Sequence, residues 1–364
     1  MTEPGDKESN QEKMAAQVPK AFQRLMVSSL TPTFRNAISL ETVPMVKPGP
    51  KEVVVKNRFV GINASDVNFT AGRYDPTKVP PFQVGFEGVG VVAAAGAESN
   101  FKVGQPVGYL HDGAFTEYKV LPTKFAIPLP SLKAEYIPLM VSGLTAAISF
   151  DEVGDLKKGE TVLVTAAAGG TGQFAVQLAK KAGCRVIGTC STDAKMEFLR
   201  SIGCDRPINY KKEDLNEVLK TEYPKGVDVV YESVGAQMFD TCVNRLALKG
   251  RLIVIGFITG YKSDIGYTPI KGGATLPPKL LTKSASVRGF FLFHYTNLWV
   301  EYLQRLVSMY HAGDLVSQVD RGEASGTGVF NKGLQSIPDA VEYLYTGQSK
   351  GKIIVEFPER NSKL

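Results

Sequence analysis

The residues best suited to do chemistry form a loop of small side chains that runs from Ala166 to Gly172 with the sequence AAAGGTG. A strand-like apolar run, Thr161–Thr165, precedes this loop, and helix-like sequence, Gln173–Ala182, follows it. Small side chains let the backbone approach a pyrophosphate, and a helix start presents free N–H groups and the positive end of its dipole. A glycine-rich turn alone is weak evidence, but a second strand–helix unit follows here, as the motif requires. We therefore predict a dinucleotide site at Gly169, Gly170, Thr171 and Gly172.

The end of the next predicted strand, Cys184–Cys190, indicates which dinucleotide binds. An acidic residue there would accept a hydrogen bond from the ribose 2′-OH and repel a 2′-phosphate. The chain instead continues with Ser191, and we interpret the later Asp193 as the N-cap of the following helix. The Ser191 hydroxyl and the Lys195 cation suit a phosphate, so the pattern favours NADP (NADPH) over NAD. Lys195 also fits the alternative of an exposed lysine in a first helical turn.

Metal catalysis is not expected, because zinc requires Cys, His or carboxylate ligands that converge on one point. No Cys precedes Cys184, and the first 140 residues contain one His, His111. Two carboxylates in that region, Asp66 and Glu87, are interpreted as buried partners of backbone amides. The four Cys residues lie between 184 and 242 with no close pairing, which argues against a disulfide scaffold.

Length and charge restrict the class of protein further. The 364 residues suggest two domains, and the net charge of +6 is too weak and dispersed to predict nucleic-acid binding. No apolar run reaches the roughly 18 residues that a membrane span needs, so none is expected. Residues 1–20 are polar, and we interpret them as a mobile leader.

Two patterns of secondary structure follow the leader. Up to about residue 140, short β-rich runs such as Lys51–Ser65 and Phe86–Gly96 alternate with Gly and Pro, which is typical of a barrel-like β domain. Beyond that point strands such as Cys184–Cys190 and Arg251–Phe257 alternate with helices, which indicates a parallel doubly wound sheet. The last fifty residues add a helix and a strand, Gly351–Phe357.

Motifs over nearly the whole chain now show a resemblance: NRFVGINASDVN (57–68), PFQVGFEGVGVVAAAG (81–96), VTAAAGGTGQFAVQLAK (164–180), VVYESVG (229–235) and GKIIVEF (351–357). In this order they resemble the medium-chain dehydrogenases/reductases of the quinone oxidoreductase branch, and within it the prostaglandin reductases. The resemblance implies an α/β fold with a GroES-like substrate domain (21–145 and 310–364) and an inserted Rossmann NADP-binding domain (146–309). Zinc-bearing relatives have Cys and His at the positions of Asn63 and Phe86, so the resemblance also implies no metal.

The resemblance implies a set of contacts with NADPH. They comprise the pyrophosphate at Thr171, the 2′-phosphate end at Ser191, Lys195 and Tyr210, the ribose at Ser233, the nicotinamide at Ile255, Tyr261, Phe290, Phe291 and Leu292, and a last contact at Ser349. Relatives often have Asn at that last position, and a hydroxyl can still form the bond. The apolar run at 290–293 would fit a buried core equally well, and Tyr210 would also fit a packed surface aromatic.

The implied activity is NADPH-dependent reduction of the carbon–carbon double bond of α,β-unsaturated ketones, as in a 15-oxo-prostaglandin 13-reductase. Tyr261 is the candidate donor to the developing oxyanion. Asn63, Asn68 and Tyr74 lie in the loop that would form a wall of an apolar substrate cleft, although turn structure alone would also explain them. Two alternatives remain: an NADPH:quinone reductase, and a non-catalytic NADPH-binding protein. Many relatives are homodimers, so a dimer is an open expectation.

The chain ends with Ser362, Lys363 and Leu364. An S-K-L tripeptide at a C-terminus is a peroxisomal address that an import receptor reads. Pro358 and the polar residues after it should release this tail into solvent. We therefore expect a peroxisomal protein with a possible cytosolic pool.

Overall fold

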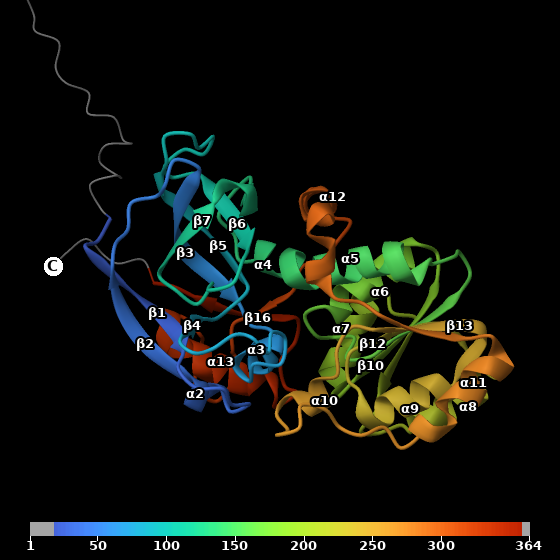
Figure 1. Ribbon diagram of the computed structural model, residues 1–364. Helices are drawn as coiled ribbons and strands as arrows, with labels where there is room; N and C mark the ends of the chain where they lie inside the picture. The colour runs from blue at the N-terminus through green and yellow to red at the C-terminus, as the bar shows by residue number, and fades with distance from the viewer. Residues whose placement is uncertain (1–17, 359–364) are drawn as a thin grey trace, which may run out of the picture.

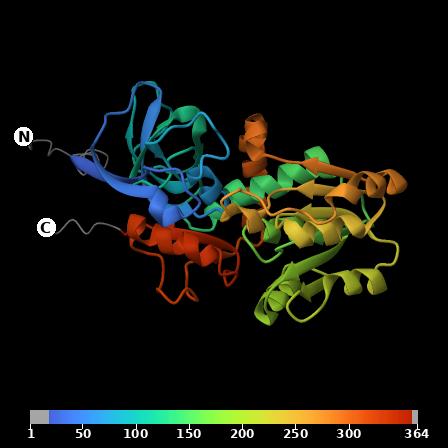
Figure 2. The same cartoon turned by 60° about the horizontal axis from the view of Figure 1, so that its bottom comes forward.

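The computed structural model describes residues 18–358, so the predicted leader, except its last three residues, and the Ser362–Leu364 tripeptide lie outside the described residues. Figure 1 shows a β-rich domain, coloured blue to teal, beside a second domain in which helices flank a central sheet. The red C-terminal segment returns to the first domain and packs beneath its strands (Figure 2).

Short strands build the β-rich domain as two small, mostly antiparallel sheets. The strand order is β2-β1-β4 in one sheet and β15-β16-β3-β5-β6-β8 in the other, where β7 also pairs with β3. The elements are β1 (Ala21–Val27), α2 (Phe34–Ala37), β2 (Ile38–Pro44), β3 (Glu52–Gly61), α3 (Ser65–Thr70), β4 (Phe82–Gln83), β5 (Glu87–Ala95), β6 (Pro106–Leu110), β7 (Tyr118–Pro122), β8 (Ala126–Pro128), β15 (Val319–Asp320), α13 (Ile337–Leu344) and β16 (Lys352–Glu356). Antiparallel pairing of β16 with β3 brings the end of the chain into this domain.

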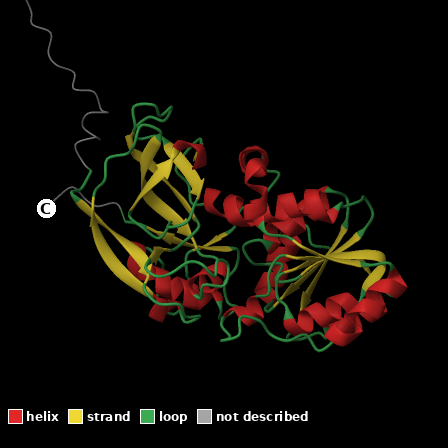
Figure 3. Cartoon of the chain, viewed as in Figure 1, coloured by secondary structure: helices red, strands yellow, loops and turns green. Residues whose placement is uncertain are grey.

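The second domain contains one sheet of six parallel strands in the order β11-β10-β9-β12-β13-β14. Its elements are β9 (Thr161–Val164), α6 (Gly172–Lys181), β10 (Arg185–Cys190), α7 (Asp193–Ser201), β11 (Arg206–Asn209), α8 (Leu215–Glu222), β12 (Val227–Glu232), α9 (Ala236–Asn244), β13 (Leu246–Val254), α10 (Ile258–Tyr261), α11 (Leu276–Lys283), β14 (Ser286–Gly289) and α12 (Trp299–His311). Figure 3 shows the strands between two layers of helices.

Alternation along the strands explains the two helical layers. Val162 and Val164 of β9 belong to the core cluster that contains α6, α7 and α12, whereas Leu163 belongs to the cluster under α8 and α9. Successive strand side chains point to opposite faces, so an apolar run without polar interruptions requires cover on both sides. The predicted α/β class, with a GroES-like domain and a doubly wound parallel sheet, is confirmed.

A helical segment, Tyr136–Gly154, connects the two domains and includes α4 (Tyr136–Pro138) and α5 (Leu144–Ser149) (Figure 1). Its 19 residues reach a mean hydropathy of 1.2 and satisfy the length and composition of a membrane span. Buried core helices have the same properties, and 72% of this apolar window is buried inside the protein. We therefore assign the segment to the core that the two domains share.

Candidate active site

The glycine-rich loop has the close backbone contacts that a pyrophosphate cradle requires. A Cβ atom on Gly172 would lie 2.5 Å from the carbonyl oxygen of Ala166, so only glycine fits where the loop enters α6. Gly169 pairs with Gly351 in an isolated β-bridge, which places the loop against the start of β16. The Thr171 hydroxyl lies 3.0 Å from the carbonyl oxygen of Ser142 and 2.7 Å from the Tyr231 hydroxyl. What Thr171 can offer a dinucleotide is therefore its backbone N–H at the helix start.

The residues predicted to hold the 2′-phosphate lie together. The Ser191 hydroxyl and the Lys195 ammonium both donate to the carbonyl oxygen of Gly347, at 3.1 and 2.7 Å. Each side chain is 8% exposed, and burial lowers the pKa of Lys195. Tyr210 begins the turn after β11 and is half exposed, so its ring lies at the surface near this end of the sheet.

The predicted N-cap of α7 is wrong. The hydroxyl of Thr192, rather than the carboxylate of Asp193, accepts from the backbone N–H of Lys195, at 3.3 Å. The Asp193 carboxylate instead contacts the Lys212 ammonium at 2.5 Å and the Asn209 amide at 3.0 Å. The correction does not change the predicted preference for NADPH, because the Asp193 carboxylate is bonded to Asn209 and Lys212 at the end of β11.

The predicted nicotinamide residues at 290–292 follow β14, on the opposite side of the sheet from β10 and β11. Some of these side chains are buried and one is exposed. Phe290 and Leu292 are core side chains, and Phe290 stacks on Tyr295 with ring centroids 4.9 Å apart. Phe291 is 39% exposed, and its ring lies 5.5 Å from that of Tyr74. The segment 290–292 therefore fits both alternatives in part. Phe290 and Leu292 belong to the core, and Phe291 is an exposed aromatic side chain beside Tyr74 of the predicted cleft wall.

Two further predicted residues stand at the strand ends that meet here. The backbone N–H of Ile255 donates to the carbonyl oxygen of Glu232 at 2.7 Å, directly after β13. The Ser233 hydroxyl follows β12 and lies 3.4 Å from the Thr165 hydroxyl. Because carboxyl ends of parallel strands meet at one edge of the sheet, both residues lie where an α/β fold binds its ligand.

Tyr261 is brought to Tyr74 and Asn68 by the packing of α10 against α3. Its ring is 6% exposed, its hydroxyl accepts from the backbone N–H of Phe257 at 3.3 Å, and it interacts with the Tyr74 hydroxyl. Asn68 interacts with Tyr74 in turn. Burial raises the pKa of Tyr261, so the phenol keeps its proton at neutral pH and remains a hydrogen-bond donor.

Arg73 holds these residues in place from within the same loop. Its guanidinium donates to the carbonyl oxygen of Tyr261 at 2.7 Å and to the side-chain oxygen of Asn68 at 3.1 Å, and it also contacts the carbonyl of Ser263. Arg73 thereby ties the substrate domain to the α10 turn of the Rossmann domain. Sequence reasoning missed this role, although the residue lies in the AGRYD segment next to Tyr74.

Asn63 belongs to a separate buried cluster. Its side-chain amide donates to Glu87 at 2.9 Å, and its side-chain oxygen accepts from the Lys352 ammonium at 2.5 Å. Lys352 also forms an ion pair with Glu87 at 2.6 Å, with side chains 3% and 0% exposed. Both polar ends of the Asn63 side chain are thus bonded within the protein, and the residue is 8% exposed. The sequence signal for Lys352 is a lysine at the start of the apolar strand IIV.

Asp66 and Glu87 do bind backbone amides, as their sequence positions suggested: Asp66 accepts from Asn63, and Glu87 accepts from Val141, each at 2.8 Å. The second carboxyl oxygen of Asp66 has no partner among residues 18–358. Burial raises the pKa of Asp66 to about 8, so the group is largely protonated at neutral pH.

The donor set at this position does not fit zinc. Among residues 18–358 no three His, Cys, Asp or Glu side chains gather where they could hold a metal ion. The Lys352 ammonium already contacts Glu87 and Asn63, and Phe86 packs against Phe69 with ring centroids 5.0 Å apart. A cation bonded to the one carboxylate of the cluster leaves no anionic ligand for a metal.

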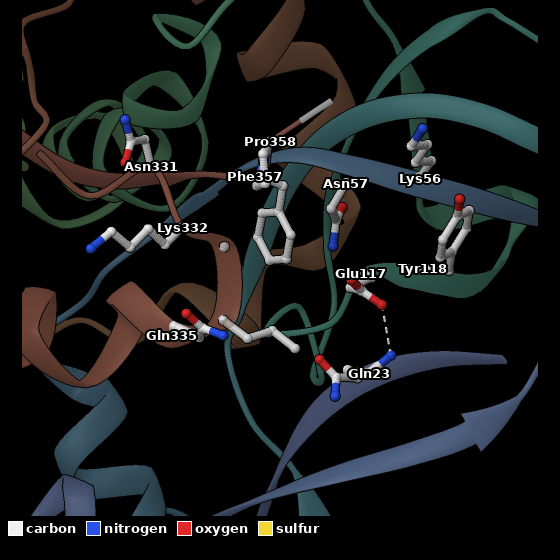
Figure 4. A pocket seen from close by; sticks show the side chains of 12 residues that line it. Gln23, Lys56, Asn57, Glu117, Tyr118, Asn331, Lys332, Gln335, Phe357 and Pro358 are labelled. Carbon is white, nitrogen blue, oxygen red and sulfur yellow. Dashed lines mark hydrogen bonds between the residues drawn. The ribbon is translucent and has the colours of Figure 1, made fainter. Parts of the chain in front are cut away.

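Two surface hollows of about 390 Å³ each lie away from these residues. One is bounded by side chains of β1, β3 and β7 and by the loop 331–335, with Phe357 and Lys56 at its wall (Figure 4). The other lies over α5, α6 and α12 of the second domain. Neither includes a predicted site residue, so the candidate site rests on the convergence of side chains at the domain junction.

The fold and this site define a class of protein: a GroES-like domain joined to a Rossmann sheet with a glycine-rich loop, and a buried ammonium bonded to Glu87 and Asn63. The chain belongs to the medium-chain dehydrogenase/reductase family. Residues 49–131 match the "Alcohol dehydrogenase GroES-like domain" model, and residues 170–308 match the "Zinc-binding dehydrogenase" model.

Individual proteins of this family are similar to the chain over most of its length. It is 56% identical over 344 residues to prostaglandin reductase-3 of Mus musculus, an alignment that covers 94% of this chain and 91% of that one. It is 33% identical over 320 residues to the NADP⁺-dependent 2-alkenal reductase of Nicotiana tabacum, which covers 85% and 88% of the two chains. The structure of Escherichia coli quinone oxidoreductase complexed with NADPH superposes with a TM-score of 0.78 at 27% identity, over 92% of this chain and 99% of that one.

Proposed function

We propose that this protein is an NADPH-dependent reductase of the carbon–carbon double bond of α,β-unsaturated ketones, with 15-oxo-prostaglandins as the physiological class of substrate. The observation that carries the proposal is the phenol of Tyr261, which is buried at the domain junction and interacts with the hydroxyl of Tyr74, whose ring in turn lies 5.5 Å from that of Phe291. The identity to prostaglandin reductase-3 and to 2-alkenal reductase supports the reaction class. Buried Ser191 and Lys195 support NADPH as the cofactor.

The cofactor, when bound, supplies a hydride to the β-carbon of the enone. The π electrons then move toward the carbonyl oxygen, where negative charge develops. Tyr261 donates a hydrogen bond to that oxygen through its O–H, since its own oxygen already accepts from the backbone N–H of Phe257. The burial of Tyr261, which is 6% exposed, limits competition from water and so strengthens this bond. The α-carbon then takes a proton from water or from the Tyr261 hydroxyl, which completes the reduction.

A substrate screen that follows NADPH oxidation at 340 nm tests the reaction class. The purified protein should turn over 15-oxo-prostaglandins and simple enones, with a product reduced at the double bond. Turnover of o-quinones alone would instead favour the quinone reductase alternative. Tight NADPH binding with no turnover of either class would favour a non-catalytic protein.

We also propose import into peroxisomes through Ser362, Lys363 and Leu364. An eicosanoid-type enone substrate supports this location, because peroxisomes process oxidised lipid chains. Imaging of an N-terminally tagged protein tests it: the intact chain should overlap with a peroxisomal marker, and deletion of the last three residues should abolish the overlap. Puncta that persist after the deletion would contradict this address.

A homodimer is a further part of the proposal. The last strand of the parallel sheet, β14, has one neighbour within residues 18–358, and Leu248 and Leu281 nearby are 76% and 81% exposed. An open strand edge beside exposed apolar side chains is a typical pairing surface. Light scattering coupled to size exclusion should give twice the mass of 39.4 kDa, and a monomer would contradict this part of the proposal.

A further inference from the structure

A short loop of the substrate domain, residues 346–350, reaches across the domain junction to the predicted 2′-phosphate site. Its Gly347 carbonyl accepts both Ser191 and Lys195, which lie 156 and 152 residues earlier in the chain. The loop also carries Ser349, one of the predicted cofactor contacts. A carbonyl of one domain therefore holds the two phosphate-binding side chains of the other.

The loop is fixed at both of its ends. The Thr346 hydroxyl donates to the carbonyl oxygen of Tyr343 at 2.8 Å, and the backbone N–H of Lys350 donates to Asp320 at 2.7 Å. The backbone N–H of Gly351 then donates to the carbonyl oxygen of Ala168 in the glycine-rich loop, at 2.8 Å. Because these contacts restrict the loop, the position of the Gly347 carbonyl is determined by the fold.

Lys195 can serve this carbonyl and a phosphate together. An ammonium has three N–H donors and the Gly347 bond takes one, so two remain for phosphate oxygens. A free lysine would lose rotamer freedom on binding, whereas one already held by a hydrogen bond loses less. Ser191 has a single O–H and can serve either partner in turn. The lasting partner of the Gly347 carbonyl is therefore Lys195.

We propose that the Gly347 carbonyl orients Lys195 for the 2′-phosphate, so that the selectivity for NADPH over NADH is determined from both domains. Gly347 is thus a positioning residue that acts through Lys195. The inference rests on the proposed cofactor and deepens it. It assigns the substrate domain a part in cofactor selection that the glycine-rich loop and the strand end do not account for.

Gly347 offers a clean perturbation. Its φ is +70°, a backbone conformation that β-branched residues avoid and Asn tolerates, and a Cβ there meets nothing within 4 Å. Gly347→Val should therefore displace the carbonyl by backbone strain alone, whereas Gly347→Asn should retain it. Gly313 provides the matched control, because its φ is +75° and its Cβ position is equally open.

The experiment is calorimetric titration of the full-length protein with NADPH and with NADH, in the absence of substrate. Gly347→Val should raise the Kd for NADPH about 3- to 10-fold, in the range of one hydrogen bond, and should change the Kd for NADH less than about 2-fold. Gly347→Asn and Gly313→Val should retain the wild-type ratio of the two constants. Thermal unfolding of each variant checks that it is folded.

A double-mutant cycle with Lys195→Met then tests the route of the effect. If Gly347 acts through Lys195, Gly347→Val should not lower selectivity further in the Lys195→Met background. Equal effects in both backgrounds, equal weakening of both cofactors, or tighter NADPH binding by Gly347→Val would overturn the inference. Failure of the cofactor assignment looks different, because the wild-type protein itself would then show no preference for NADPH.

Discussion

Replacement of Lys352 by Met removes the ammonium from the buried cluster and leaves the Glu87 carboxylate, which is 0% exposed, without its counter-charge. Two neutral donors remain for this carboxylate, the Asn63 amide and the Val141 backbone N–H. Loss of one partner of a buried ion pair destabilises a fold by about 3–5 kcal/mol. The unfolding entropy is about 2.1 cal/mol/K per residue, or about 0.8 kcal/mol/K for a chain of this length, so we expect Tm to fall by about 4–7 °C.

Thermal unfolding followed by circular dichroism measures this change. Lys350→Met is the matched control: Lys350 is an exposed lysine two residues earlier whose ammonium lies 5.9 Å from the Phe198 ring, so its substitution should alter stability by no more than about 1 kcal/mol. Glu87→Gln added to Lys352→Met removes the stranded charge and should recover part of the loss. A Tm for Lys352→Met within 1 °C of the wild type, or a further loss on adding Glu87→Gln, would refute the assignment of a buried ion pair.

The remaining predictions concern NADPH binding by Lys195, the hydroxyl of Tyr261, independence from metal, and the protonation of Asp66. Lys195→Ala should weaken NADPH binding by about 1.5–3 kcal/mol, the range of a charged hydrogen bond, and NADH binding much less; equal losses by calorimetry would remove the phosphate assignment. Tyr261→Phe should lower kcat about 10- to 1000-fold with little change in NADPH affinity, whereas Tyr267→Phe, exposed on the same loop, should not; an unaltered kcat would exclude the donor role. Prolonged chelation should leave activity intact, and stoichiometric zinc needed for turnover would contradict the donor-set argument. The pKa of Asp66 is raised from 3.8 to about 8 by burial, so the folded state binds the extra proton and stability should fall as pH rises between these values; Asp66→Asn should flatten this slope in urea titrations, and an unchanged slope would count against it.

Local patterns in the sequence predicted much of the fold. The loop AAAGGTG between an apolar run and a helix-like segment led to β9, α6 and the cradle at Gly172. The N-cap of α7 was wrong because Thr192 and Asp193 are both good caps, and propensity alone does not choose between neighbours. At 290–292 the apolar run did not reveal which ring would be buried, since that depends on the facing Tyr295 and Tyr74.

The sequence by itself determined the class of fold, the cofactor loop and the missing zinc ligands, because each of these depends on which residue types occur and in what order along the chain, and not on which side chains meet in space. Tertiary structure alone decided which distant groups meet. Lys352 bonds to Asn63 across 289 residues, Arg73 to the Tyr261 carbonyl across 188, and Lys195 to the Gly347 carbonyl across 152. Such partners are selected by the packing of sheets and helices, since a buried polar group must find its hydrogen bond wherever the fold brings a complementary group. No local pattern records that meeting.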